Sequence, residues 1–317
     1  MKRALCAGEC MVELTHTDAS TLRLGFAGDT YNTAVYLRRV AAELDLELEV
    51  GYLTGVGDDD YSAAMREAWR VEGVADRSVL LPGRTPGLYA IRTAATGERR
   101  FTYWRHMSAA SEVFRGSDWC DGLDGDLIHL SGITLQLTSP RSRETLLVRL
   151  AELRAAGAWV SFDTNYRPAG WSFGREAADA IDKVCSLANF VLASRDDETL
   201  LHGPADPDAC IRRISGLGAT EVILRDGAAG AYVGTDGDVR HIAARPVERV
   251  LDTTAAGDAF AGGYLAARLA GHAPTLAAGI GNGVAAVVIQ HPGAIAPPGI
   301  RLSPAARPGT ISQVPAG

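Results

Sequence analysis

The sequence predicts an α/β fold in which a mainly parallel β-sheet lies between two layers of helices and carries a small β lid. The chain has 317 residues, of which 47% are hydrophobic, and this is enough to bury one large core. Short strand-like runs alternate with helical patterns along most of the length, as is typical of βαβ units. One stretch, 87–105, interrupts the alternation with two consecutive strand-like segments.

Six strand-like runs precede or follow helical segments. They cover 4–14, 48–56, 126–133, 159–166, 189–194 and 221–227. Helical spacing of apolar residues predicts helices at 32–44, 61–73, 140–157, 176–188 and 208–218. The segment 140–157 is the clearest of these, because leucines recur on one face and Gly157 stands where a helix C-cap belongs.

Two hairpins are expected outside this alternation. In 87–105 the turn falls at Thr96-Gly97-Glu98, and the hairpin is expected to project from the sheet as a lid. In 230–244 the turn falls at Asp236-Gly237.

The last residues, 297–317, are rich in proline and lack periodicity. We therefore expect one domain over 1–296 followed by a flexible C-terminal tail.

Composition narrows the class of ligand. The net charge is −7 and the 31 basic residues are scattered, which argues against nucleic acid or an anionic membrane as a partner. No run reaches the roughly 18 apolar residues of a membrane span, and Glu9 and Glu13 interrupt the apolar N-terminus too early for a secretion signal. The five cysteines are widely spaced and favour reduced, packed thiols. We expect a cytoplasmic protein with a small-molecule ligand.

The stretch 252–270, DTTAAGDAFAGGYLAARLA, contains the most informative pattern. The residues after Asp258 are small or apolar, which predicts a helix buried on most sides. Ahead of it, Thr254-Ala255-Ala256-Gly257 leaves the backbone N–H groups of the helix start accessible, so the segment predicts a seat for an anion. A carboxylate beside a bound phosphate can take a proton from an attacking hydroxyl, which indicates phosphoryl transfer. The alternative is that Asp258 merely caps the helix.

The segment DTTAAGDAF resembles the second signature of the ribokinase-like (PfkB) carbohydrate kinases, DTxGAGD, with Ala255 in place of a glycine. The resemblance implies a Rossmann-like three-layer α/β/α fold and makes Asp258 the catalytic base. It also implies that the amides of Ala255, Ala256 and Gly257 form the anion hole, and that Asp252 lies near a metal or monovalent cation. With alanine at 255, the seat is expected to form at φ values that an alanine accepts.

Other segments resemble the same family in the same order. In 27–39 the resemblance implies that Gly28, Asp29 and Asn32 hold sugar hydroxyls. The segments 224–233 and 281–294 resemble the nucleotide loop and the helix over adenine. With the family's NxxE element, which appears here as 194–197, they imply ATP contacts from Ser194, Arg225, Gly227, Gly230, Ala256, Gly257 and Asn282. In that element Asp197 replaces a glutamate, and it is expected either to hold Mg²⁺ or to cap a helix.

Aromatic, amide and basic side chains at strand ends and on the hairpin indicate the substrate. These are Tyr89, Tyr103, Arg105, Asn165 and Arg167. Two converging arginines would bind a carboxylate through paired N–H donors and would be left unpaired by a neutral sugar. The whole set resembles the bacterial 2-keto-3-deoxygluconate kinases.

The resemblance implies ATP-dependent phosphorylation of 2-dehydro-3-deoxy-D-gluconate at its terminal hydroxyl, with Mg²⁺ as a cofactor; whether a monovalent cation such as K⁺ is also needed stays open.

Three alternatives stay open. A fructokinase or another sugar kinase of this fold would share the anion seat, and a non-catalytic sugar-acid sensor would fit the altered 194–197 element. A Rossmann dehydrogenase would fit the α/β alternation, although no GxGxxG follows the first strand. The exposed edges of a projecting hairpin favour a homo-oligomer.

Overall fold

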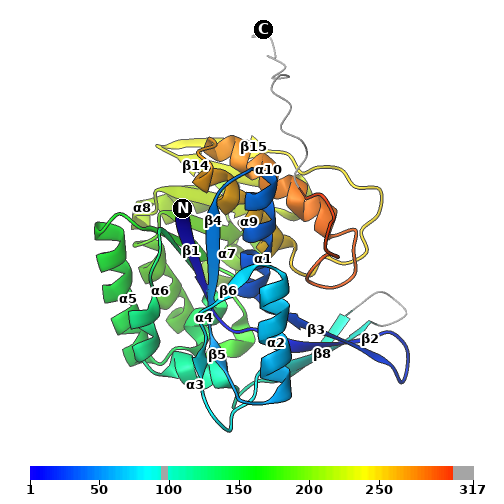
Figure 1. Cartoon of the computed structure of the whole chain (residues 1–317). Helices are drawn as coiled ribbons and strands as arrows, with labels where there is room; N and C mark the ends of the chain where they lie inside the picture. The colour runs from blue at the N-terminus through cyan, green and yellow to red at the C-terminus, as the bar shows by residue number, and fades with distance from the viewer. Residues whose placement is uncertain (94–98, 303–317) are drawn as a thin grey trace.

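The computed structural model of the chain describes residues 1–93 and 99–302, and it has the predicted three-layer α/β/α architecture (Figure 1). The central sheet has nine strands in the order β15-β14-β13-β12-β11-β10-β1-β4-β6. Neighbours from β6 to β13 pair in parallel, and β14 and β15 extend the sheet in antiparallel fashion. The strands are β1 (Lys2–Ala7), β4 (Leu48–Leu53), β6 (Val74–Asp76), β10 (Leu127–Ser131), β11 (Trp159–Asp163), β12 (Phe190–Ser194), β13 (Glu221–Arg225), β14 (Ala231–Thr235) and β15 (Asp238–Ile242).

Helices cover both faces of this sheet, and each face has its own core. One core is formed with α1 (Asp29–Glu43), α2 (Asp60–Val71), α9 (Ala256–Leu269) and α10 (Pro274–Val288). The other is formed with α3 (Ala109–Arg115), α4 (Gly132–Leu137), α5 (Pro140–Ala155), α6 (Gly174–Cys185), α7 (Arg195–His202) and α8 (Pro207–Leu217). The five predicted helices are confirmed. They start up to three residues earlier than predicted and end one to three earlier, because polar first-turn residues and caps such as Asp59 and Asp206 precede the apolar pattern.

The predicted strand 4–14 is wrong, because the chain changes sheets inside it. After β1, the segment β2 (Met11–His16) belongs to a second sheet with order β3-β2-β8-β9. This sheet projects from the domain in Figure 1 and is the lid. Its strands β8 (Gly87–Thr93) and β9 (Arg99–Trp104) are the predicted hairpin, whereas β3 (Leu22–Ala27) was not predicted. The predicted turn at 96–98 lies outside the described residues.

The hairpin β14–β15 is confirmed, with Asp236 and Gly237 both at positive φ (51° and 85°), as a two-residue turn between twisted strands requires. The predicted strand 48–56 is divided, because β4 ends at Leu53 and β5 (Gly55–Val56) pairs in a separate sheet with β7 (Val79–Leu80), which was not predicted.

The C-terminal segment stays attached beyond residue 296. Leu302 is 1% exposed within the first core, and its N–H donates to Glu43 Oε1 at 2.7 Å. The domain boundary expected at 296 is therefore too early, because packing against α1 continues to residue 302. The rest of the expected tail lies outside the described residues.

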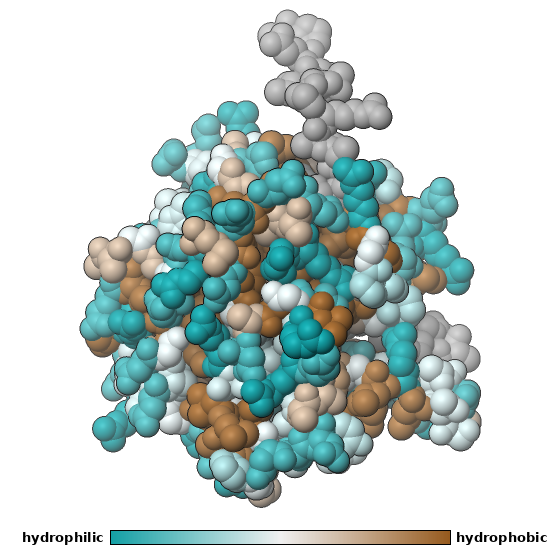
Figure 2. Space-filling view, in the orientation of Figure 1, coloured by the Kyte–Doolittle hydropathy of each residue, from teal (hydrophilic) through white to brown (hydrophobic). Residues whose placement is uncertain are grey.

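The surface in Figure 2 mixes hydrophilic and hydrophobic residues over the face shown. Within 1–93 and 99–302, no helix has both the length and the apolar character needed to cross a membrane. All five cysteines are buried and unpaired by disulfides, which confirms that they are packing thiols.

Candidate active site

An open cavity of about 1070 Å³ lies at the carboxyl ends of the parallel strands, where α/β sheets bind ligands. Its walls come from the ends of β11, β12 and β13, from the start of α9 and from the lid. The predicted site residues that line it are Gly28, Asp29, Asn32, Tyr89, Tyr103, Asn165, Arg167, Ser194, Asp197, Arg225, Gly227, Gly230, Ala255, Ala256, Gly257, Asp258 and Asn282. Arg105 and Asp252 do not line it.

The predicted anion seat is the N-terminus of α9. The N-cap is Ala255, which has left-handed backbone angles (φ 60°, ψ 12°), so the expectation that the seat forms at φ values ordinary for alanine is wrong. This conformation turns the chain into the helix, where the first N–H groups lack intrahelical acceptors. The amide of Ala256 is already bonded to the Thr253 carbonyl oxygen at 3.2 Å. The N–H groups that remain for an anion in the first turn are therefore chiefly those of Gly257 and Asp258.

We expect the substitution Ala255→Gly to stabilise the protein. Left-handed φ is unfavourable for any residue with a Cβ, so glycine should raise the free energy of unfolding by about 0.5–1 kcal/mol after its larger backbone entropy is subtracted. Urea denaturation measures the change. Ala256→Gly is the matched control, because Ala256 is helical and its replacement should lower stability. A stability loss in Ala255→Gly equal to that of the control would contradict the prediction.

Asp258 is the third residue of α9, and its carboxylate faces the cavity rather than capping the helix. Its Oδ2 accepts a hydrogen bond from Asn32 Nδ2 at 2.8 Å, and Thr33 Oγ1 bonds the Asp258 carbonyl oxygen at 3.4 Å. Burial, followed by the nearby Asp29 carboxylate, raises the pKa of Asp258 to about 7, while the Asn32 hydrogen bond opposes this shift. Asp258 is therefore suited to exchange a proton near neutral pH.

This pKa predicts the pH dependence of activity. A carboxylate that accepts a proton must be ionised, so kcat/KM should rise with pH through a midpoint near 7. Asn32→Leu removes the donor that favours the ionised form, so the midpoint should move to higher pH. Profiles of kcat/KM for both proteins test this. A wild-type profile that is flat between about pH 5.5 and 8.5 would contradict it.

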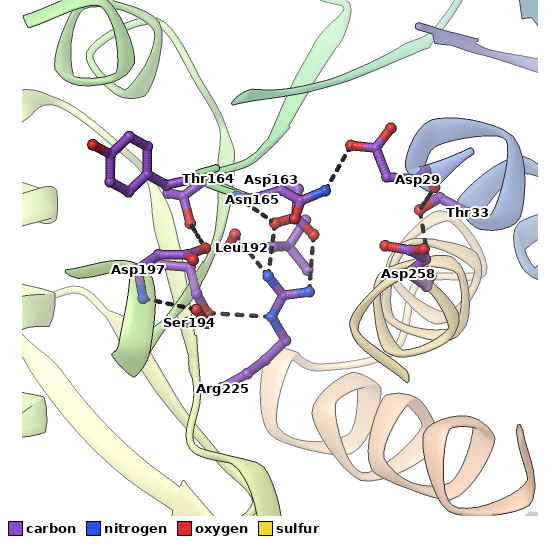
Figure 3. Close-up of polar contacts among 12 residues, drawn as sticks. Asp29, Thr33, Asp163, Thr164, Asn165, Leu192, Ser194, Asp197, Arg225 and Asp258 are labelled. Carbon is purple, nitrogen blue, oxygen red and sulfur yellow. Dashed lines mark hydrogen bonds and ion pairs between the residues drawn. The ribbon is translucent and has the colours of Figure 1, made fainter. Parts of the chain in front are cut away.

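A buried ion pair forms the floor of the cavity (Figure 3). Arg225 at the end of β13 binds Asp163 at the end of β11 through two N–H donors, at 2.8 and 2.7 Å. A Cβ on Gly257 would lie 2.7 Å from Arg225 Nη1, so this glycine is what lets the anion seat lie against the guanidinium. Asp163 was not predicted as a site residue. The available signal was its place at the end of a buried strand, two residues before Asn165.

Asn165 joins the two sides of the cavity. Its Nδ2 donates to Asp29 Oδ2 at 2.7 Å, as Figure 3 shows, and so links the end of β11 to the start of α1. Tyr89, on β8 of the lid, is fixed in position because its hydroxyl donates to the buried carboxylate of Glu13 on the neighbouring strand β2.

The predicted metal ligands differ in position. Asp252 does not face the cavity, because its two carboxylate oxygens accept the N–H groups of Thr254 (2.7 Å) and Gly293 (2.8 Å) and so join two loops. Asp197 does face the cavity, and it accepts a hydrogen bond from Thr164 Oγ1 at 3.0 Å. The cap of α7 is Ser194, so the alternative that Asp197 is an N-cap is wrong. Across residues 1–93 and 99–302, no cluster of three or more acidic, His or Cys side chains could hold a metal by itself.

The two predicted carboxylate-binding arginines lie at different depths. Arg167 lines the cavity with a side chain that is 58% exposed. Arg105 is not one of the lining residues; its Nη2 forms an ion pair with the buried carboxylate of Glu9, and one-fifth of its side chain remains exposed. Of these two arginines only Arg167 lines the cavity, and contact of Arg105 with the substrate carboxylate stays a prediction.

Comparison with known proteins agrees with this geometry. The family model of the pfkB family carbohydrate kinases matches residues 1–300. The chain belongs to this family. The kinase is 41% identical over 307 residues to the 2-dehydro-3-deoxygluconokinase of Escherichia coli strain K12, covering 93% of the chain and 97% of that relative. It is 40% identical over 306 residues to the enzyme of the same name from Dickeya dadantii strain 3937, with the same coverage.

A solved structure shows the same architecture. Aminoimidazole riboside kinase from Salmonella enterica, complexed with aminoimidazole riboside and an ATP analog, superposes on the kinase with a TM-score of 0.77 at 26% identity. The match covers 92% of this chain and 95% of that one. The family and the fold predicted from the sequence are confirmed.

Proposed function

We propose that this kinase transfers the γ-phosphoryl group of ATP to the terminal 6-hydroxyl of 2-dehydro-3-deoxy-D-gluconate. The observation that carries the proposal is the cavity wall, in which the Arg167 guanidinium and the Tyr103 ring lie in the same cavity as Asp258 and the anion seat. A sugar acid would place its carboxylate at Arg167 and its far hydroxyl at Asp258. The names of the curated relatives support this choice of substrate.

The proposed chemistry uses the residues at the start of α9. Asp258 takes the proton of the sugar hydroxyl as that oxygen bonds to the γ-phosphorus, and the bond from the γ-phosphorus to the bridging oxygen of ADP breaks. In this proposal the helix amides and the Arg225 guanidinium, which lies against Gly257, stabilise the negative charge that accumulates on the phosphoryl group. Two hydrogen-bonded pairs, Asn165 with Asp29 and Asn32 with Asp258, line the cavity and can orient the sugar hydroxyls.

The nucleotide would lie along Ser194, Gly227, Gly230 and Asn282. Asn282 Nδ2 donates to the carbonyl oxygens of Ile242 and Ala243, both at 3.0 Å, which fixes the loop beside it. Asp197 fits a Mg²⁺ ion held chiefly by phosphate oxygens and water, because, of the two acidic residues of the 194–197 element that line the cavity, Asp196 and Asp197, it is the buried one. Such an ion supplies charge neutralisation of the phosphates when it is bound with ATP.

A substrate screen tests the proposal. ADP release should be measured with 2-dehydro-3-deoxygluconate, its galactonate isomer, fructose and no sugar. We expect the gluconate derivative to give the highest kcat/KM. A higher value for fructose would favour the fructokinase alternative, and no sugar-dependent ADP release would favour the sensor.

The substitution Arg167→Ala should weaken the sugar acid selectively. The loss of a charged hydrogen-bond donor should raise the KM for the keto acid by roughly 10- to 100-fold. The KM for fructose should change little, because fructose has no carboxylate. Arg195→Ala is the control, since Arg195 also lines the cavity but is held by Asp226 at 2.9 Å, whereas the pair of Arg167 with Asp197 is looser, at 3.8 Å. It should preserve the preference between the two sugars, and equal losses for both sugars in Arg167→Ala would contradict carboxylate recognition.

A further inference from the structure

A buried carboxylate lies directly behind the sugar end of the cavity and has no part in the chemistry above. Glu9 follows β1, and its side chain is 0% exposed. Its Oε1 accepts a hydrogen bond from Ser108 Oγ at 2.5 Å, and its Oε2 contacts Arg105 Nη2. Burial of an ion pair costs desolvation free energy that the attraction between the two charges can fail to recover. We therefore ask what function the buried Glu9–Arg105 pair serves.

Glu9 lies where the four strands of the lid leave and rejoin the domain. It precedes β2, Gly28 follows β3, Gly87 begins β8 and Arg105 follows β9. A Cβ at Gly28 would lie 2.0 Å from the Glu9 carbonyl oxygen, and a Cβ at Gly87 would lie 2.8 Å from Glu9 Oε1 and 3.2 Å from Arg105 Cβ. The lid crossings are therefore packed directly against the Glu9–Arg105 pair.

The same pair adjoins the sugar side of the cavity. Gly28 and Tyr103 line the cavity, and Tyr103 is two residues before Arg105. Burial raises the pKa of the Tyr103 hydroxyl, and the charges of Arg105 and then Arg167 oppose this shift. One-fifth of the Arg105 side chain remains exposed although Nη2 is buried.

We infer that Glu9 is a positioning residue for sugar-acid recognition, which acts by holding one edge of the Arg105 guanidinium so that the rest meets the substrate carboxylate beside Tyr103. This inference rests on the proposed function. A guanidinium presents five N–H donors in a rigid plane, so an anchored edge fixes the direction of the others. The anchored side chain also loses less conformational freedom when the sugar acid binds.

The substitution Glu9→Gln tests the inference, because it removes the charge and keeps the shape. We expect the KM for 2-dehydro-3-deoxygluconate to rise at least ~10-fold, with kcat and the KM for ATP changed by less than about 3-fold. The KM for fructose should stay near its wild-type value. The matched control is Glu221→Gln, which breaks the buried pair of Glu221 with Arg268 (2.5 Å). Glu221 lies at the start of β13, and the cavity lies at the other end of that strand, at Arg225. It should lower stability without a selective change in KM.

A double variant separates positioning from a purely structural role. If Glu9 acts through Arg105, the variant Glu9→Gln/Arg105→Gln should have the same sugar-acid KM as Arg105→Gln alone. The comparison of the double variant with Arg105→Gln still tests whether Glu9 acts through Arg105 when Glu9→Gln alone does not fold. The double variant is expected to fold, because it leaves neither charge buried without its partner. A further rise of KM in the double variant would overturn the inference, as would an unchanged KM in folded Glu9→Gln.

The outcomes also separate the two proposals. A wild-type enzyme that phosphorylates the sugar acid while Glu9→Gln keeps its KM refutes this inference and leaves the proposed function intact. A wild-type enzyme that phosphorylates neutral sugars but not the sugar acid refutes the proposed function and this inference with it.

Discussion

Replacing the carboxylate of Asp258 by an amide should abolish most turnover while leaving nucleotide binding in place. In Asp258→Asn the side chain keeps its size beside Asn32 but can no longer accept the hydroxyl proton. General-base catalysis contributes on the order of 10²–10⁴ in rate, so kcat should fall by that factor. The Kd for ATP, measured by calorimetry, should change little, because the helix amides and Arg225 remain.

A control variant separates the loss of the base from a change in its pKa. Asn32→Asp puts a second acid next to Asp258 without removing it, so activity should fall at neutral pH and return as the pH is raised. Asp258→Asn should show no such recovery at any pH. Turnover near the wild-type value in Asp258→Asn would remove Asp258 from the chemistry.

The second large effect is expected on stability, at the floor of the cavity. Asp163→Ala leaves the Arg225 guanidinium buried without its bidentate partner, with Ala193 and Leu192 carbonyl oxygens as its remaining acceptors. Breaking a buried pair from one side should lower the free energy of unfolding by about 3–5 kcal/mol. Urea denaturation followed by tryptophan fluorescence measures this.

Two further variants separate charge from packing. The double variant Asp163→Leu/Arg225→Met removes both charges and should recover much of the stability, though not the activity. Asp124→Ala breaks the exposed pair with Arg3 (2.7 Å) and should leave stability nearly unchanged, because solvent screens that pair. A stability loss in Asp163→Ala no larger than in Asp124→Ala would contradict the prediction.

Most of the main sheet and its helices could be predicted, because their signals are local. Leu146, Leu150 and Leu153 are buried in the structure as their helical spacing predicts. The lid was predicted only in part. In β3, Leu22 and Leu24 are exposed, so its apolar alternation reflects pairing with β2 rather than a core. The sequence of a strand with exposed side chains resembles that of a polar loop, so β3 could not be predicted from its sequence.

The sequence predicted most of the residues that line the cavity, but it did not predict which of them contact one another. The segments around 28–32 and 255–258 line one cavity as expected, yet Asn32 and Asp258 are 226 residues apart in sequence. Arg105 was expected in the wall because its residue type suits a carboxylate. Its ion pair with the buried Glu9 was not predicted, because the two residues are far apart in sequence and meet only where the lid joins the domain.

The sequence by itself determined most of the alternation of strands and helices in the main sheet, the small-residue start of α9 and the family to which the chain belongs. These follow from residue size, periodicity and short motifs, which act over a few neighbouring positions. The tertiary structure alone decided the charge pairs Glu9–Arg105 and Asp163–Arg225, the left-handed N-cap at Ala255 and the raised pKa of Asp258. Charge interactions and desolvation depend on distance in space, and the fold brings these groups together from segments far apart in the chain.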